Sequence, residues 1–173
     1  MKKHKIKAVI FDLGSTLLRI RGHAYRRLLK KYHVSLDPKD FGVLYGKIFN
    51  KRVWKNVDKA FEQLAQQLGQ VNNLSFRREM KKIWKDHNLM HKFDTTDPVL
   101  KMLRKHRYKI GLISNFGQNC YEVLDYHGLR EYFHSIAISA HECILKPDPR
   151  IFRKVLKHLK ARPQEALMVG DHP

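Results

Sequence analysis

The stretch Val9-Ile10-Phe11-Asp12-Leu13-Gly14-Ser15-Thr16-Leu17 decides how the rest of the chain is interpreted. It completes an apolar run from Lys5 to Phe11, and a short apolar run bounded by polar residues is typical of a buried β-strand. At Asp12 the pattern changes to small and polar residues, which are typical of a turn. The sequence therefore predicts a buried strand that ends in a tight turn, with Asp12 at its carboxyl end.

The second half of the chain alternates between strand-like and helix-like segments. Strands are predicted at 108–113, 135–139 and 166–169, and helices near Asp97-Pro98, from 118 to 126 and from 149 to 159. Parallel strands need a crossover connection, usually a helix, so this alternation predicts right-handed βαβ units. The expected fold class is α/β, with a doubly wound, Rossmann-like parallel sheet.

The segment between Arg19 and Met90 follows a different, helical pattern. Apolar residues recur at helical spacing over 24–32, 38–49 and 57–68, and Ser75 is expected to cap a fourth helix. We expect these four helices to pack on each other. The predicted organisation is an α/β core made of residues 1–18 and 91–173, with a helical cap of residues 19–90 inserted after the first strand.

Polar residues stand where each predicted strand ends. They are Asp12, Ser114-Asn115, Lys146-Pro147 and Asp171. In open parallel sheets, ligands bind beyond the carboxyl ends of the strands. Two carboxylates suit Mg²⁺, which typically takes one or two carboxylates plus substrate phosphate, and a lysine and a hydroxyl suit phosphate oxygens. The sequence therefore predicts a site at this edge of the sheet, where an aspartate could also attack phosphorus.

The same residues resemble the motifs of the haloacid dehalogenase superfamily. Residues 9–17 are similar to its first motif, commonly written DxDGT, and Leu112-Ile-Ser114-Asn115 resembles the second. Lys146-Pro-Asp-Pro149 resembles the third motif, and Val169-Gly170-Asp171 the beginning of the fourth. The order and spacing of the motifs agree, and the helical insertion is similar to that family's cap domain.

This resemblance implies a role for each motif residue. Asp12 would be the nucleophile and, with Lys146, would carry catalysis. The phosphoryl group would be held by Ser114, Asn115, Lys146 and Thr16. Mg²⁺, the implied cofactor, would be bound by Asp12, the carbonyl of Gly14 and Asp171. The implied reaction is hydrolysis of a small phosphorylated metabolite through an aspartyl-phosphate.

Gly14 departs from the family pattern. The family's phosphatases place a second aspartate two residues after the nucleophile, where it protonates the leaving group and later activates water. General acid–base catalysis is typically worth roughly 10²–10⁴-fold. The family's dehalogenases and phosphonate hydrolases also lack this aspartate, so cleavage of a carbon–halogen or carbon–phosphorus bond at Asp12 is an alternative.

The end of the chain also departs from the family pattern. In the family the fourth motif continues with another acidic residue, a helix and a final strand, whereas this sequence ends at Asp171-His172-Pro173. We expect the core to lack its last helix and strand, and the sequence to be incomplete.

The formal net charge of +19 is unusual. Between Arg19 and Lys92 the sequence has 18 lysines and arginines against 6 aspartates and glutamates, so the excess concentrates in the predicted cap. The simpler interpretation is a solvated, lysine-rich surface. The alternative is a polyanion- or nucleic-acid-binding protein on a degenerate hydrolase scaffold, which the intact Asp12, Lys146 and Asp171 disfavour.

The two cysteines, Cys120 and Cys143, have neither CxxC spacing nor a disulfide-framework pattern. The apolar run near the start is too short for a signal peptide, and no stretch has the length of a transmembrane helix. We therefore expect a cytoplasmic protein with reduced thiols.

Overall fold

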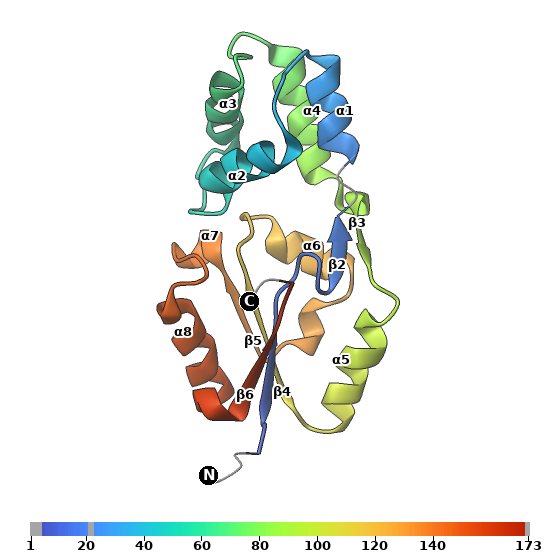
Figure 1. The fold of residues 1–173 in the computed structure, drawn as a ribbon, viewed down its shortest axis with the longest axis vertical. Helices are drawn as coiled ribbons and strands as arrows, with labels where there is room; N and C mark the ends of the chain where they lie inside the picture. The colour runs from blue at the N-terminus through green and yellow to red at the C-terminus, as the bar shows by residue number, and fades with distance from the viewer. Residues whose placement is uncertain (1–4, 21–22, 172–173) are drawn as a thin grey trace.

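A four-stranded parallel sheet forms the centre of the protein in the computed structural model, which describes residues 5–20 and 23–171. Its strands are β1 (Ala8–Phe11), β4 (Lys109–Ser114), β5 (Ser135–Ile138) and β6 (Ala166–Val169), in the order β5-β4-β1-β6 (Figure 1). β1 lies between β4 and β6, and all four of its residues are buried. The predicted fold class, a parallel α/β sheet with inserted helices, is confirmed.

Alternate residues of β1 point to opposite faces of the sheet, which explains why helices cover both faces. Val9 and Phe11 share a core with residues of α5 (Thr96–Lys105) and α6 (Cys120–Tyr126). Ala8 and Ile10 share a second core with α8 (Pro149–Leu159). Gly111 on β4 permits this close approach, because a Cβ there would lie 2.8 Å from Cγ1 of Val155.

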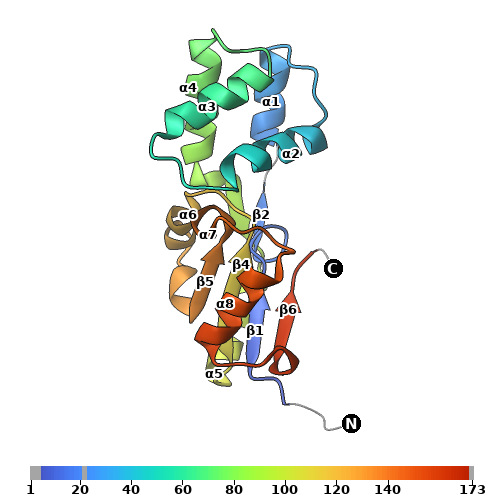
Figure 2. The same cartoon turned by 90° about the vertical axis from the view of Figure 1, so that its left-hand side faces the viewer.

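The four helices of the cap lie beyond the carboxyl ends of the sheet strands (Figures 1 and 2). They are α1 (His23–Lys31), α2 (Pro38–Phe49), α3 (Val57–Gln67) and α4 (Leu74–Lys85), and they bury a core of their own that includes Phe49, Phe61, Leu64, Phe76 and Met80. The expected packing of these helices on each other is therefore present.

One predicted helix start in the cap is wrong. Asn73, not Ser75, caps α4, because its side chain accepts a hydrogen bond from the backbone N–H of Phe76 at 3.0 Å. This bond starts the helix at Leu74 and leaves Ser75 within the first turn. Asp37 caps α2 as expected, with Pro38 at the first helical position.

A second, two-stranded sheet joins the cap to the core and was not predicted. β2 (Leu18–Ile20) runs antiparallel to β3 (Met90–Lys92), with Arg19 opposite His91. Three residues per strand are too few to show a period of two, so the sequence pattern could not reveal it. The predicted boundaries between core and cap, after residue 18 and before residue 91, fall within this link.

The bounds of α2, α8 and β6 match the prediction, β1 begins three residues later than predicted, and several other boundaries differ by one or two residues. β4 ends at Ser114 and α6 begins at Cys120, while Ser139 starts a short helix, α7 (Ser139–Glu142), that the sequence analysis missed. The described residues also form the 3₁₀ helices η1 (His87–Leu89), η2 (Arg130–Tyr132) and η3 (Pro163–Glu165). Among the described residues, no helix has both the length and the apolar character that a membrane crossing requires.

Candidate active site

Asp12 and Lys146 form an ion pair at the carboxyl edge of the sheet. Nζ of Lys146 lies 2.6 Å from Oδ2 of Asp12, and each side chain is 17% exposed. The backbone N–H of Asp12 donates to the carbonyl of Val169 at 2.9 Å, which continues the pairing of β1 with β6. Oδ1 of Asp12 accepts the N–H of Leu13 at 2.7 Å, so both carboxylate oxygens are held in place.

Asn115 fixes the segment that carries Lys146. Its side-chain N–H donates to the carbonyl of Lys146 at 3.0 Å, and its Oδ1 accepts the backbone N–H of Lys146 at 2.7 Å. The preceding residue, Ser114, ends β4 and is 3% exposed. The structure thus brings three of the predicted residues, Asp12, Asn115 and Lys146, into one connected group.

The turn after Asp12 is tightly folded. The backbone N–H groups of Leu17 and Leu18 both donate to the carbonyl of Leu13 at 2.9 Å, and the N–H of Ser15 donates to the carbonyl of Leu18 at 2.8 Å. Ser15 has a φ of 57°, in the left-handed region. This conformation costs a residue with a Cβ roughly 1–2 kcal/mol, which is a physical reason for the glycine at this position of the resembling motif.

Thr16 lies in this turn and carries a polar atom without a protein partner. Its hydroxyl oxygen is buried and makes no hydrogen bond to any residue that the structure describes. Leaving a buried hydroxyl unpaired costs about 1–3 kcal/mol. A bound oxygen ligand would satisfy this hydroxyl.

The oxygen atoms predicted to bind a metal come from neighbouring strand ends. Asp12 follows β1 and the exposed Asp171 follows β6, the strand paired with β1, while Gly14 lies two residues into the turn. Within 5–20 and 23–171, no three His, Cys, Asp or Glu side chains gather into a metal-binding cluster. Because Mg²⁺ usually takes one or two carboxylates and completes its shell with phosphate oxygens and water, this all-oxygen set still fits Mg²⁺.

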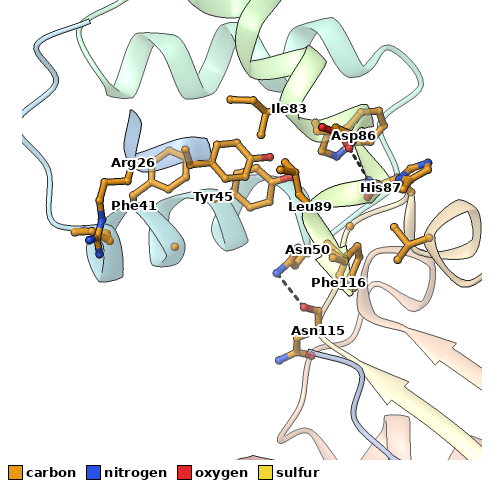
Figure 3. A pocket seen from close by; sticks show the side chains of 18 of the residues that line it. Arg26, Phe41, Tyr45, Asn50, Ile83, Asp86, His87, Leu89, Asn115 and Phe116 are labelled. Carbon is orange, nitrogen blue, oxygen red and sulfur yellow. Dashed lines mark hydrogen bonds between the residues drawn. The ribbon is translucent and has the colours of Figure 1, made fainter. Parts of the chain in front are cut away.

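A cavity of about 330 Å³ separates the cap from the loop that follows β4. Its walls come from α1, α2 and α4 on the cap side and from residues 115–119 on the core side (Figure 3). Burial raises the pKa of Tyr25, on the cap side, to about 12. Asn115 lines this cavity and also holds the backbone of Lys146, so this residue connects the cavity to the ion pair, although neither Asp12 nor Lys146 lines the cavity.

Four hydrogen bonds hold the cap against the core around this cavity. Asn50 donates from its side chain to the carbonyl of Asn115 at 3.1 Å, and the Ser139 hydroxyl donates to the carbonyl of Asn50 at 2.7 Å. The N–H of Trp54 donates to Oε1 of Gln118 at 2.6 Å, and the side chain of Asn119 donates to the carbonyl of Trp84 at 3.2 Å. Sequence reasoning missed all of these contacts, because they join residues 35–89 positions apart.

The protein has a parallel α/β core with a helical cap above it. An aspartate and a lysine are paired at the carboxyl edge of the sheet, which is the arrangement of a capped hydrolase with an α/β core. The model of the haloacid dehalogenase-like hydrolases matches residues 6–173. The chain belongs to this family.

Known relatives agree with this assignment. Pyrophosphatase PpaX of Bacillus cereus is 26% identical over 175 residues, which cover 97% of this chain and 76% of the relative. A family enzyme of Bacteroides thetaiotaomicron, solved with magnesium and inorganic phosphate, has a TM-score of 0.71 at 18% identity and covers 96% of this chain and 85% of its own.

The fold alone does not separate the reactions of the family. A 2-haloacid dehalogenase of Pseudomonas syringae also matches, with a TM-score of 0.63 at 23% identity, and covers 97% of this chain and 79% of its own. A dehalogenase and an enzyme that binds phosphate therefore share this architecture, and the reaction has to be argued from the site.

Proposed function

We propose that the protein is a Mg²⁺-dependent phosphatase that hydrolyses a small phosphorylated metabolite through an aspartyl-phosphate on Asp12. The observation that carries this proposal is the pairing of Asp12 with Lys146 at 2.6 Å, at the carboxyl edge of the sheet. A lysine placed there can neutralise phosphoryl oxygens while the aspartate attacks phosphorus.

The proposed reaction has two steps. A carboxylate oxygen of Asp12 forms a bond to phosphorus, and the ester P–O bond breaks, with its electron pair leaving on the alcohol oxygen, which takes up a proton from solvent water. Lys146 holds the phosphoryl oxygens, and the Ser114 hydroxyl and the Asn115 backbone N–H would complete their contacts. Water then attacks phosphorus, which releases inorganic phosphate and restores the Asp12 carboxylate.

Mg²⁺ would be held by Asp12, the Gly14 carbonyl and Asp171, and when bound it would neutralise charge on the phosphoryl oxygens. The buried, unpartnered hydroxyl of Thr16 supports an oxygen-rich ligand near this turn. The pyrophosphatase activity named for the relative from B. cereus supports chemistry at phosphorus. Two free thiols, at Cys120 and Cys143, support a reducing compartment such as the cytoplasm.

Gly14 favours a second candidate, cleavage of a carbon–halogen or carbon–phosphorus bond at Asp12. Both reactions use an aspartate nucleophile in this family, and the dehalogenases do not need the acid–base residue that Gly14 replaces. The substrate and the product together separate these candidates. A dehalogenase releases halide without added metal, a phosphonate hydrolase releases inorganic phosphate from a phosphonate but not from a phosphate ester, and the proposed phosphatase releases inorganic phosphate from a phosphate ester only when Mg²⁺ is present.

The experiment is to substitute Asp12→Asn and to follow phosphate release from 4-nitrophenyl phosphate with and without Mg²⁺. The amide keeps the shape of the carboxylate but is a poor nucleophile, so we expect turnover to fall by at least about 10³-fold with an unchanged circular dichroism spectrum. The matched control is Asp94→Asn, an exposed aspartate before α5, which should keep the parent rate. Full activity in the Asp12 variant would refute the assignment of the nucleophile.

A further inference from the structure

The cavity under the cap is walled mainly by apolar and aromatic side chains. Tyr25, Phe41, Tyr45, Trp84 and Phe116 all line it. Phe41 and Tyr45 project from α2 towards Ile83 of α4, while Phe116 lies beside Asn115 on the core side (Figure 3). Its volume, about 330 Å³, is at the lower end of the roughly 300–1,000 Å³ of ligand pockets.

Several polar groups around the cavity already have partners. The amide of Asn50 is bonded to the carbonyl of Asn115, and that of Asn119 to the carbonyl of Trp84. Asp86 accepts the backbone N–H of Asn88 at 3.1 Å. The buried indole N–H of Trp84 has no partner among the described residues and offers one unused donor, and the guanidinium of Arg26 is also among the lining groups. A ligand rich in hydroxyl groups would still leave most of them against aromatic and aliphatic side chains, and an unpaired hydroxyl in such a place is unfavourable.

We infer that the substrate carries an apolar, ring-sized group that occupies this cavity, so that the preferred substrates are phosphate monoesters of apolar alcohols. This inference rests on the proposed function, because it places the phosphoryl group at Asp12 and the alcohol portion beyond Asn115. Asn115 supports this orientation, since it lines the cavity and also fixes the backbone of Lys146. Inorganic diphosphate, the substrate class that the relative's name implies, has no apolar part to fill this space.

Gly42 offers a way to fill the cavity without disturbing its walls. It lies on the cavity side of α2, and a Cβ built there meets no heavy atom within 4 Å. A leucine at this position would extend into the space and would also suit a helix better than glycine. The neighbouring Val43 is 53% exposed and does not line the cavity, so Val43→Leu is a matched control on the same helix.

The first measurement compares 2-phenylethyl phosphate with glycerol 3-phosphate. Both are esters of primary alcohols, so their leaving groups differ little in basicity and the comparison reports on binding of the alcohol portion. We expect kcat/KM to be at least about tenfold higher for the phenylethyl ester. Gly42→Leu should remove this preference, mainly through KM, and Val43→Leu should keep it.

The second measurement does not depend on catalysis. Calorimetric titration with the uncharged alcohol 2-phenylethanol should show binding to the parent protein and to Val43→Leu, and at least about tenfold weaker binding to Gly42→Leu. Binding without hydrolysis of either ester would refute the proposed phosphatase and leave the inference about the cavity standing. Equal or better turnover of glycerol 3-phosphate, or alcohol binding that Gly42→Leu does not change, would overturn the inference.

Discussion

Gly14 is the residue at which this chain departs from the phosphatases that its first motif resembles. The proposed attack by Asp12 needs the leaving alkoxide to be protonated, and hydrolysis of the aspartyl-phosphate needs a water to be deprotonated. A carboxyl group two residues along the same turn can do both, and a glycine can do neither. In the structure, the positive φ of this turn lies at Ser15 rather than at Gly14, so the backbone at Gly14 is not in the conformation that disfavours a side chain.

The substitution Gly14→Asp tests whether proton transfer limits the rate. We expect kcat for 4-nitrophenyl and alkyl phosphates to rise by at least about tenfold, with the larger gain for the alkyl ester, because its alkoxide needs the proton more. Gly14→Asn is the matched control, since it adds a similar side chain without an ionisable group. Equal rates in the two variants would show that another residue already supplies the proton or that the natural reaction is not ester hydrolysis.

At the residue level, the sequence pattern placed the candidate site residues at one edge of the sheet, and the structure joins three of them, Asp12, Asn115 and Lys146, through contacts that the pattern did not predict. Asp12, Asn115, Lys146 and Asp171 each follow a strand, and parallel strands bring their ends to one edge of the sheet. Two sets of contacts depend on loop conformations. One joins the Asn115 side chain to the Lys146 backbone, and the other joins Asn50 to Asn115. Loop conformations have no period that a sequence pattern can show.

At the scale of secondary-structure elements, ion pairs of the buried Glu165 connect the segment before β6 to the segment before β1. Glu165, at the end of η3, is paired with Arg162 at 3.0 Å and with Lys7, just before β1, at 2.6 Å. Its backbone carbonyl also accepts the N–H of Lys7 at 2.7 Å. Hydrogen bonds from Arg162 and then from Lys7 hold the pKa of the Glu165 carboxyl well below its ordinary value.

The pKa of Glu165 is lower in the folded protein than in the unfolded chain, where it is roughly 4.3. The ionised carboxyl therefore stabilises the fold at pH values above this unfolded pKa, and the stabilisation is lost as the pH falls below it. We expect Glu165→Gln to lower the melting temperature at pH 7, with the difference from the parent shrinking as the pH falls below about 5. Thermal unfolding followed by circular dichroism between pH 3 and 7 measures this, with the exposed Glu131→Gln as the control. A difference that is constant with pH would show that the ionised pair does not fasten β6.

Elements with strong local signals were predicted well, and elements defined by tertiary contact were not. Asp148 followed by Pro149 fixes the start of α8, whose bounds match the prediction. β2 and β3 are three residues each and exist because the cap has to leave and rejoin the core at adjacent points. The short helix α7 follows β5 directly, where the apolar pattern of the strand hides the change.

At the scale of the whole molecule, the net positive charge and the cavity under the cap both bear on which ligands the protein would bind. The formal net charge of +19 favours the approach of anions, and salt limits the range of this attraction to about 8 Å at physiological ionic strength. A cavity of about 330 Å³ lies between the cap and the loop that contains Asn115. Hydrogen bonds from Asn50, Trp54, Asn119 and Ser139 join cap and core around this cavity, while the Asp12 and Lys146 side chains stay 17% exposed, so the water that the second step of the proposed reaction needs can reach the site.

The sheet also leaves one side of β6 open. Within the part of the chain that the structure describes, β6 pairs with β1 and no strand lies on its other side (Figure 2). Leu167 and Met168 on this strand are 52% and 39% exposed. Unpaired backbone groups beside exposed apolar side chains are a template for pairing with another chain, so this edge favours self-association.

We expect Leu167→Lys to reduce this self-association, because a charged side chain on an edge strand has to be desolvated before a second strand can pair with it. The measurement is the weight-average mass by light scattering over a range of protein concentrations. The control is Val71→Lys, which adds the same charge at a cap residue that is 52% exposed and far from the sheet. A lower mass in the Leu167 variant alone assigns association to the β6 edge, whereas an equal drop in both variants would assign it to net charge and refute the role of this edge.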